Sequence, residues 1–529
     1  MAQRADRRKV AIYDTTLRDG TQAQSVSLSR EDKILIARRL DEFGVDYIEG
    51  GYPLSNPKEE AFFAEMANVE LKHAKLTAFG MTRKKGVAVA EDASIRALVA
   101  SQAPVVAIVG KADEYQVRKV LGASLDENLR MIAESVRYCR DQGREVVFDA
   151  EHFFDGYKRS PESALKIVQA AAEAGATTAC LCDTNGGSLS NEVFEITAEV
   201  VKHLGGHVTV GFHGHNDTGL AVANSLAAVR AGAGQVQGTI NGIGERCGNA
   251  DLTAIIPNLV LKMGCDALAR PENLKKLTEV SRYVYEIANL NLPEHQPYVG
   301  TAAFAHKGGM HVHAILKDTA SYEHVAPEEV GNTRKVLISE LSGASNVIAK
   351  SALTQQLQDK GLTRKVLARV QDLENQGYQF EAADASFHLL TLKLLDQYAP
   401  SFKLDHYRVV ILKRDDAPPG TEAIVKLTVD GRIEHEVAEG DGPVNALDAA
   451  LRKALVRHYP QIETLQLVDY KVRIVNPRAG TAAKTRVIIE SSDGTEHWGT
   501  IGVSDNIIDA SWDALVDSIE YKIFKERRK

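Results

Sequence analysis

The sequence predicts a (β/α)8 TIM barrel, followed by a helical linker region and a C-terminal pseudo-symmetric α+β domain that repeats a βββα unit. Strand-like and helix-like patterns alternate eight times within about 260 residues, which is the length of one such barrel. The next stretch has helical patterns without strand alternation. The last stretch contains two similar segments in succession, which indicates an internal repeat. We therefore expect a catalytic barrel at 1–265, helical linker subdomains at 266–385 and a regulatory domain at 386–529.

The barrel is expected to begin with the apolar stretch KVAIYDTTLRDG at 9–20. An amphipathic helix follows at 29–43, where Ser29 is a suitable N-cap and Gly44 ends the helix. Further strands are predicted at 45–53, 75–80, 105–110, 145–153, 177–186, 207–217 and 235–245. A doubly wound open sheet is the alternative, but LRDGTQ after the first strand lacks the GxGxxG turn of a dinucleotide-binding sheet.

The C-terminal repeat is visible in residues of similar type that lie 64 positions apart. They are Asp441/Asp505, Val444/Ile508, Ala446/Ala510, Ala450/Ala514 and Leu451/Leu515. Each copy reads as three short strands and a helix. Such symmetry suggests a small-ligand or dimerisation module, and nothing in it indicates catalysis.

The composition excludes several classes of protein. Lys and Arg total 63 against 71 Asp and Glu, and a net charge of −8 argues against a nucleic-acid partner. No run of 18 apolar residues is present, and MAQRADRRKV lacks the apolar core of a signal peptide, so we expect no membrane association. Five cysteines without a CxxC pair fit a reducing cytoplasm, and Cys180 and Cys182 read as buried core thiols.

Polar side chains gather where the predicted strands end, which is the catalytic face of a barrel. They include Arg18, Asp19, Glu49, Asp149, Glu151, Asp183, Thr184, His213, His215 and Asn249. Residues i and i+2 of a strand point the same way, so His213 and His215 both face the barrel mouth. With Asp19 they form a mixed N/O site for Zn, Mn or another divalent ion; the alternative is a hydrogen-bonded pair of core histidines.

Arg18 allows two interpretations, because an arginine is always charged and needs anions. It forms a salt bridge with Glu49 or Asp149, or it holds a substrate carboxylate or enolate beside the metal. The site fits metal-assisted hydrolysis or carbon–carbon bond chemistry at a metal-bound 2-oxo acid. The position of the two histidines on the seventh strand favours the second chemistry. Residues around 79–81 and 110–111 are expected to line the pocket for that acid.

The segment around His306, AFAHKGG, is flanked by glycines, and we expect a functional role for this histidine. His311 and His313 lie in a predicted helix. Their side chains would point about 200° apart, so we expect no joint metal site there.

Three motifs carry a family resemblance. IYDTTLRDGTQ, GFHGHNDTGLAVANSLAAVRAGA and GTINGIGERCGNADL closely resemble the 2-isopropylmalate synthase, homocitrate synthase and citramalate synthase family of acyl-CoA-condensing barrel enzymes. The resemblance covers nearly the whole chain. VDYIEGGYPLSNPKE, FDAEHFFDGYK and LCDTNGG look like the citramalate synthase branch. Thr21 fits that branch, since many 2-isopropylmalate synthases have Glu in this position of RDGEQ.

The resemblance implies a set of metal ligands and catalytic groups. The implied metal ligands are Asp19, His213, His215 and Asn249. Arg18 would stabilise the oxyanion of the substrate, Thr184 would bind the carboxylate of the 2-oxo acid with Asp149 nearby, and Glu151 would organise proton transfer. His306 and Tyr322 match catalytic linker residues that reach the barrel of the partner subunit, which implies a homodimer.

The resemblance also implies the reaction. We expect condensation of acetyl-CoA with pyruvate to (R)-citramalate and CoA, dependent on Zn, Mn or Mg, in isoleucine biosynthesis, with isoleucine as the effector of the C-terminal domain. Three alternatives stay open. They are a 2-isopropylmalate synthase that uses 2-oxoisovalerate, an acyl-CoA lyase, and a catalytically silent amino-acid sensor on the same scaffold.

Overall fold

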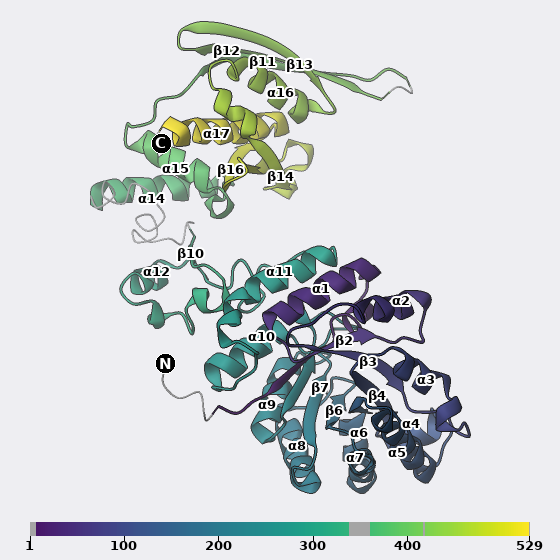
Figure 1. The fold of residues 1–529 in the computed structure, drawn as a ribbon. Coiled ribbons are helices and arrows are strands. Elements are labelled where there is room, and N and C mark those ends of the chain that lie inside the picture. Colours follow the sequence, from purple (N-terminus) through teal and green to yellow (C-terminus); the bar gives the residue numbers. More distant parts are fainter. Residues whose placement is uncertain (1–6, 338–359, 416–417, 528–529) are drawn as a thin grey trace. The chain divides into compact units, whose positions relative to one another are not determined.

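The chain divides into two compact units in the computed structural model, which describes residues 7–337, 360–415 and 418–527 (Figure 1). The first unit comprises Met1–Phe304 and Val325–Thr333, and the second comprises Ala305–His324 and Arg334–Lys529. Each unit has its own hydrophobic core.

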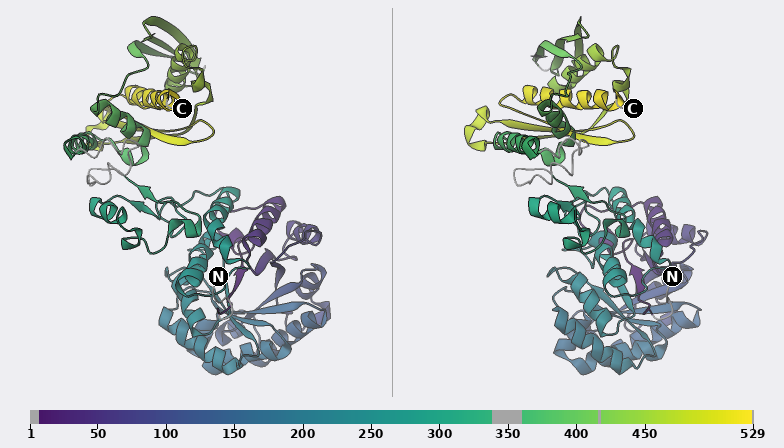
Figure 2. Two further views of the ribbon diagram at one scale, coloured as in Figure 1. Left: turned by 60° about the vertical axis from the view of Figure 1, so that its left-hand side comes forward. Right: turned by 90° about the vertical axis from the view of Figure 1, so that its left-hand side faces the viewer.

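The first unit is a closed barrel of eight parallel strands in sequence order, which confirms the predicted fold class. The strands are β1 (Ala11–Asp14), β2 (Tyr47–Gly51), β3 (Lys75–Met81), β4 (Val105–Lys111), β5 (Glu145–Glu151), β6 (Thr178–Asp183), β7 (Thr209–Gly214) and β8 (Gln235–Gly238). Helices lie outside the strands (Figures 1 and 2). The longer ones are α1 (Arg30–Phe43), α2 (Pro57–Met66), α3 (Ala93–Ala100), α5 (Leu125–Asp141), α7 (Pro161–Ala174), α8 (Ser190–Leu204) and α9 (Ala221–Ala231).

The first helix of the barrel begins and ends as its sequence predicts. The Ser29 side chain accepts a hydrogen bond from the backbone N–H of Asp32 at 3.1 Å, and the Asp32 carboxylate accepts one from the backbone of Ser29. Gly44 ends α1 in the left-handed region, with φ of 98°.

Strand β1 is shorter than the predicted strand 9–20. It ends at Asp14, whose carboxylate accepts hydrogen bonds from the backbone N–H and the hydroxyl of Thr16 at 2.9 and 2.8 Å. This side-chain turn bends the chain out of the strand. Arg18 and Asp19 therefore lie in the loop that follows β1 and not in the strand itself.

Alternation along the strands decides which side chains enter the barrel. In β5, Val147 belongs to the interior cluster, whereas Val146 and Phe148 pack in the large core between strands and helices. Asp149 and Glu151 share the parity of Val147, so they follow it along the interior face toward the mouth of the barrel.

The region predicted as a helical linker is divided between the two units. Its helices are α11 (Leu277–Ile287), α12 (Gly309–Ile315), α14 (Lys360–Asn375) and α15 (Asp384–Leu394), and it also holds the two-residue strands β9 (Ala305–His306) and β10 (Lys335–Val336). The segment at Val330 packs on the first unit, where the Thr278 hydroxyl donates to its carbonyl at 2.7 Å. The domain bounds proposed from the sequence stay predictions.

The second unit contains the predicted βββα repeat. The first copy is β11 (Lys403–Leu412), β12 (Gly420–Val429), β13 (Arg432–Gly440) and α16 (Pro443–Leu455); the second is β14 (Gln466–Ile474), β15 (Thr485–Ser492), β16 (His497–Ser504) and α17 (Ile507–Arg527). Each antiparallel sheet packs against its helix, and the equivalent residues Ala446 and Ala510 are buried in one shared core. In the described part of the chain, every helix is too short or too polar to cross a membrane.

Candidate functional site

A cavity of about 340 Å³ opens at the carboxyl ends of the barrel strands. All the residues that line it belong to the first unit. They are Arg18, Asp19, Gln22, Tyr52, Phe79, Met81, Val109, Lys111, Asp149, Glu151, Cys182, Thr184, His213, His215, Glu245 and Arg246. The structure thus brings together most of the polar residues that the sequence placed at the strand ends.

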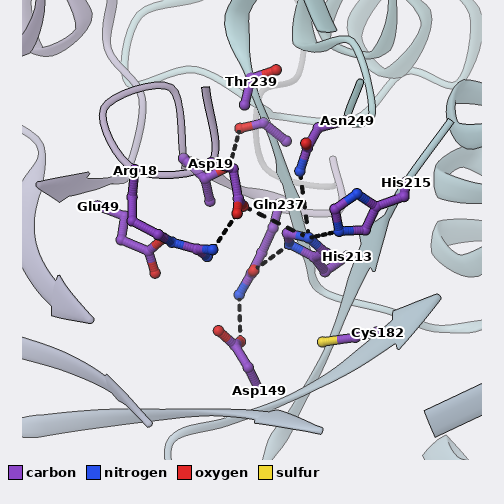
Figure 3. A network of polar contacts seen from close by, with 12 residues as sticks. Arg18, Asp19, Glu49, Asp149, Cys182, His213, His215, Gln237, Thr239 and Asn249 are labelled. Atoms are coloured by element: carbon purple, nitrogen blue, oxygen red, sulfur yellow. Dashed lines mark hydrogen bonds and ion pairs between the residues drawn. The ribbon is translucent and has the colours of Figure 1, made fainter. Parts of the chain in front are cut away.

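His213, His215 and Asp19 converge at one point of this cavity (Figure 3). Nε2 of His213 lies 3.4 Å from Nε2 of His215 and 3.7 Å from Oδ2 of Asp19. All three side chains are buried. Burial, reinforced by His213, lowers the pKa of His215 to about 4, so this imidazole is neutral at physiological pH and has a lone pair to offer.

Asn249 reaches the same point from the loop that follows β8. Its Nδ2 lies 3.5 Å from Nε2 of His213, and its Oδ1 is buried without a hydrogen-bond partner. The loop is tightly closed, because Gly248 has φ of 94° and a Cβ there would lie 2.2 Å from the carbonyl oxygen of Gly242. Only glycine fits this backbone.

Arg18 makes the predicted salt bridge with Glu49 and also lines the cavity. Its Nε donates to Oε2 of Glu49 at 2.6 Å, another nitrogen pairs with Asp19, and the guanidinium lies 4.0 Å above the centre of the Phe79 ring. The two interpretations of Arg18 are therefore compatible, since an arginine fixed by two carboxylates still faces the space where substrate would lie.

The site has more carboxylates than cations. Burial, together with Glu49, raises the pKa of Asp149 to about 7, and burial raises the pKa of Glu49. The pKa of Asp19 is lowered despite its burial, because Arg18 and both histidines stabilise the charged form. Arg18 is thus surrounded by Asp19, Glu49 and Asp149, and the raised pKa values of Glu49 and Asp149 reflect the cost of holding three carboxylates beside one guanidinium. A divalent cation at this point would favour their ionised forms.

The donors fit a divalent metal ion. Oδ2 of Asp19 and Oδ1 of Asn249 are buried without hydrogen-bond partners, and such groups are costly unless something binds them. Two imidazoles and a carboxylate form a ligand set that Zn, Mn and related ions accept. Asp19, His213, His215 and Asn249 could therefore hold the ion.

A second group of possible metal ligands lies deeper in the barrel. The ligand atoms of Asp149, Cys180 and Cys182 lie within 4.8 Å of one another. Burial raises the pKa of the Cys180 thiol well above its usual value, and Asp149 is already hydrogen-bonded. These groups are less ready to bind a cation than the Asp19 set, so we interpret both cysteines as buried thiols.

Glu151 and Thr184 lie where the sequence predicts them, on the wall of the cavity. Glu151 forms an ion pair with Lys111, and the Thr184 hydroxyl oxygen accepts a hydrogen bond from the backbone N–H of His152 at 2.8 Å. The Thr184 hydroxyl proton is left to donate into the cavity. The pairing of Lys111 with Glu151 was not predicted, although Lys111 ends the apolar run VVAIVGK.

His306 and Tyr322 belong to the second unit and do not line the cavity. Nε2 of His306 lies 3.2 Å from Oε1 of Glu323, which Arg334 also contacts at 2.5 Å. The Tyr322 ring stacks on His311, with centroids 4.2 Å apart. Their catalytic roles remain predictions.

Gln237 was missed by the sequence analysis. It lies in β8 between Asp149 and His213 and is fully buried (Figure 3). The signal that could have revealed it is the alternation of Gln235 and Gln237 in the strand QVQG, which points two amides into the barrel.

Three protein families and several known relatives match the chain. The HMGL-like family matches residues 9–284, the homocitrate synthase post-HMGL domain-like family matches 298–378, and the LeuA allosteric (dimerisation) domain matches 381–523. An (R)-citramalate synthase of Aquifex aeolicus is 52% identical, with 98% of this chain and 99% of the relative covered. One of Geobacter sulfurreducens is 50% identical, with 98% of each covered. A probable 2-isopropylmalate synthase of Methanopyrus kandleri is 33% identical, with 98% of this chain and 99% of the relative covered.

Proposed function

Because the chain belongs to the (R)-citramalate synthase family of HMGL-like enzymes, we propose that it condenses acetyl-CoA with pyruvate to give (R)-citramalate and CoA. The chain is an acyltransferase of this family. We place the acceptor at the mouth of the barrel because Asp19, His213 and His215 converge there beside Arg18.

The proposed ion is held by Asp19, His213, His215 and Asn249, and is Zn, Mn or Mg. When bound, such an ion polarises the carbonyl of a 2-oxo acid and stabilises the charge that develops on its oxygen. Arg18 adds a fixed positive charge beside Asp19. Since its contacts with Asp19 and Glu49 hold the guanidinium in place, it needs no reorganisation during the reaction.

Thr184 and Asp149 are proposed to orient the acceptor. The Thr184 oxygen accepts from His152, so its proton can be donated to the carboxylate of pyruvate. Asp149 lines the same cavity from β5. When it is ionised, it repels an acceptor whose carboxylate lies on its side of the cavity, and so favours the opposite orientation.

Proton transfer is proposed for Glu151 or His306. A base removes a proton from the acetyl methyl group, the resulting carbon attacks the ketone of pyruvate, and water cleaves the thioester to release CoA. Glu151 is held against Lys111 on the cavity wall. His306 and Tyr322 are proposed to act on the barrel of the other subunit of a homodimer.

The second unit is proposed to pair two chains and to bind isoleucine as a feedback effector. The match to a LeuA allosteric (dimerisation) domain supports this role. Apolar side chains that are exposed on its strands support a pairing surface; they are Ile411, Leu412, Ile433, Val437, Leu467, Val468, Val472 and Ile474. A particle mass twice the 57.6 kDa of one chain is expected in solution. Five free thiols and a CoA substrate support a cytoplasmic location.

The runner-up is a 2-isopropylmalate synthase that uses 2-oxoisovalerate. A relative of that name at 33% identity favours it. Product analysis distinguishes the two: the enzyme is incubated with acetyl-CoA and either ¹³C-labelled pyruvate or ¹³C-labelled 2-oxoisovalerate, with and without a chelator, and the products are identified by NMR. We expect metal-dependent citramalate. Absence of a condensed product with every 2-oxo acid tested would favour the catalytically silent sensor.

A further inference from the structure

A chain of three buried side chains connects His213 of the proposed metal site to Asp149 through Gln237. Nε2 of Gln237 donates to Oδ1 of Asp149 at 2.9 Å, and Oε1 of Gln237 lies 2.9 Å from Nδ1 of His213 (Figure 3). Gln237 lies on β8 and His213 on the adjacent β7, whereas Asp149 reaches Gln237 across the barrel interior from β5. None of them is more than 6% exposed, so water does not compete for these contacts.

The orientation of the Gln237 amide is determined by its neighbours. An amide has one end that only donates and one that only accepts. The nitrogen end faces two acceptors, Oδ1 of Asp149 at 2.9 Å and Oε1 of Gln235 at 3.5 Å. Above pH 7, where Asp149 is mostly ionised, reversing the amide would place its oxygen against a carboxylate, which is repulsive. The oxygen end must therefore face His213.

The amide oxygen in turn determines the tautomer of His213. An oxygen that can only accept requires a proton on Nδ1 of the neutral imidazole, and this leaves Nε2 without one. Nε2 is the atom that faces His215 and Asp19. With the opposite tautomer, a proton would occupy the direction in which a metal ion must bind.

We propose that Gln237 is a positioning residue which, fixed by Asp149, holds His213 in the tautomer that presents the Nε2 lone pair to the metal. The inference rests on the proposed metal site. It adds Gln237 and Asp149 as the residues that fix the protonation of one proposed ligand, His213. Hydrogen bonds of this kind commonly change metal affinity about 10–100-fold when they are removed.

Metal affinity of the full-length protein tests the proposal without any measurement of turnover. Metal is removed with a chelator, and the affinity for Co²⁺ is measured by competition with a chromogenic chelator. Gln237→Met keeps the size of the side chain but removes the acceptor, and we expect it to weaken Co²⁺ binding about 10–100-fold. Gln235→Met is the matched control, because it makes the same change two residues away on the same face and removes only the 3.5 Å contact. The 2.9 Å hydrogen bond to Asp149 still holds the Gln237 amide, so this variant should bind within about threefold of the wild type.

Exchanging the carboxylate of Asp149 and the amide of Gln237 should preserve Co²⁺ binding. In the double variant Asp149→Asn/Gln237→Glu, the new carboxylate still accepts from Nδ1 of His213, while the new amide still donates to it. Its affinity should lie near that of the wild type. Equal affinity of Gln237→Met and Gln235→Met would overturn the proposal.

A direct measurement of the tautomer covers the case in which Gln237→Met does not fold. Magic-angle-spinning NMR of histidine-labelled, metal-free wild type at pH 8 should show a proton on Nδ1 of His213, with the signal assigned by its loss in His213→Gln. A proton on Nε2 would overturn the proposal although the metal site stands. If the wild type and His213→Ala both fail to bind Co²⁺, the proposed metal site fails as well.

Discussion

Nε2 of His213 faces Nε2 of His215 across 3.4 Å, and Oδ2 of Asp19 lies 3.7 Å from the same His213 atom. Two neutral imidazoles that both direct a lone pair toward one point repel each other unless a proton or a cation lies between them. The fold maintains this arrangement at the end of β7: His213 lies in the strand, and His215 follows its last residue, Gly214, and is held by a β-bridge to Asn249. A proton between the rings would leave the buried Oδ2 of Asp19 without a partner, so we interpret the arrangement as a site for a shared cation rather than a hydrogen-bonded pair of core histidines.

Replacing either histidine should remove both the metal and the activity. We expect His213→Ala and His215→Ala to lose bound metal and to lower kcat/KM about 10³-fold or more, since preorganised charge stabilisation contributes several kcal/mol. Elemental analysis and a free-thiol assay with acetyl-CoA check this. His203→Ala, on the exposed face of α8, is the control. Near-normal turnover of His213→Ala in metal-depleted buffer would refute the assignment.

Arg18→Lys should lower kcat more than it raises KM. The guanidinium contacts Asp19 and Glu49 at once and lies over Phe79, and a lysine ammonium cannot reproduce this geometry. We expect a loss of about 10²–10³-fold in kcat, which is the usual effect of removing one group that stabilises an oxyanion. Steady-state kinetics with pyruvate as the varied substrate separate the two constants. A change confined to KM would mean that Arg18 only binds the ground state.

Metal-free protein should lose stability through His215 as the solution becomes acidic. The pKa of this buried imidazole is about 4, whereas an unfolded histidine titrates near 6.5. The folded state therefore binds the proton less readily, so this contribution is fully present above pH 6.5 and is lost as the pH falls from 6.5 toward 4.

The difference between the pKa of His215 in the folded protein, about 4, and in the unfolded chain, near 6.5, corresponds to a loss of about 3 kcal/mol in the free energy of unfolding. Thermal unfolding of metal-free wild type and of His215→Gln, compared at pH 7.5 and pH 4.5, isolates it, because other titrating groups are common to both proteins. The wild type should lose more stability than the variant over this range. An equal loss would show that His215 titrates normally in the folded protein.

Met81→Ala should relax the choice of acceptor. Met81 lines the cavity together with Phe79, Val109 and Lys111, as the sequence analysis expected for the residues around 79–81 and 110–111. One methylene in such a pocket changes discrimination by about 1–3 kcal/mol. We expect kcat/KM for 2-oxobutyrate relative to pyruvate to rise about tenfold. Leu35→Ala, at an exposed position of α1, should leave the ratio unchanged.

Regular periodicity made the barrel and much of the site predictable from the sequence. Alternation within a strand assigned His213 and His215 to one face, and polar residues after apolar runs marked the mouth of the barrel. The hydrogen-bonded turn at Asp14 was not visible, because it depends on one side chain bonding to the backbone two residues later.

Contacts between strands could not be predicted in the same way. The positions of Gln237 and Lys111 are informative only once the strands are closed into one barrel, since each pairs with a residue at least 24 positions away. The division of the linker has a similar cause. The carbonyl of Val330 accepts a hydrogen bond from Thr278 of α11, in the first unit. Local sequence patterns do not predict a contact between residues so far apart in the chain.

One competition experiment tests the central claim, that pyruvate is the acceptor at this site. The enzyme is given acetyl-CoA with equal concentrations of pyruvate and 2-oxoisovalerate, and the ratio of citramalate to 2-isopropylmalate is measured by mass spectrometry. This ratio equals the ratio of the two kcat/KM values. We expect citramalate to exceed 2-isopropylmalate by at least about tenfold, which corresponds to one or two discriminating methylenes. An excess of 2-isopropylmalate would contradict the account.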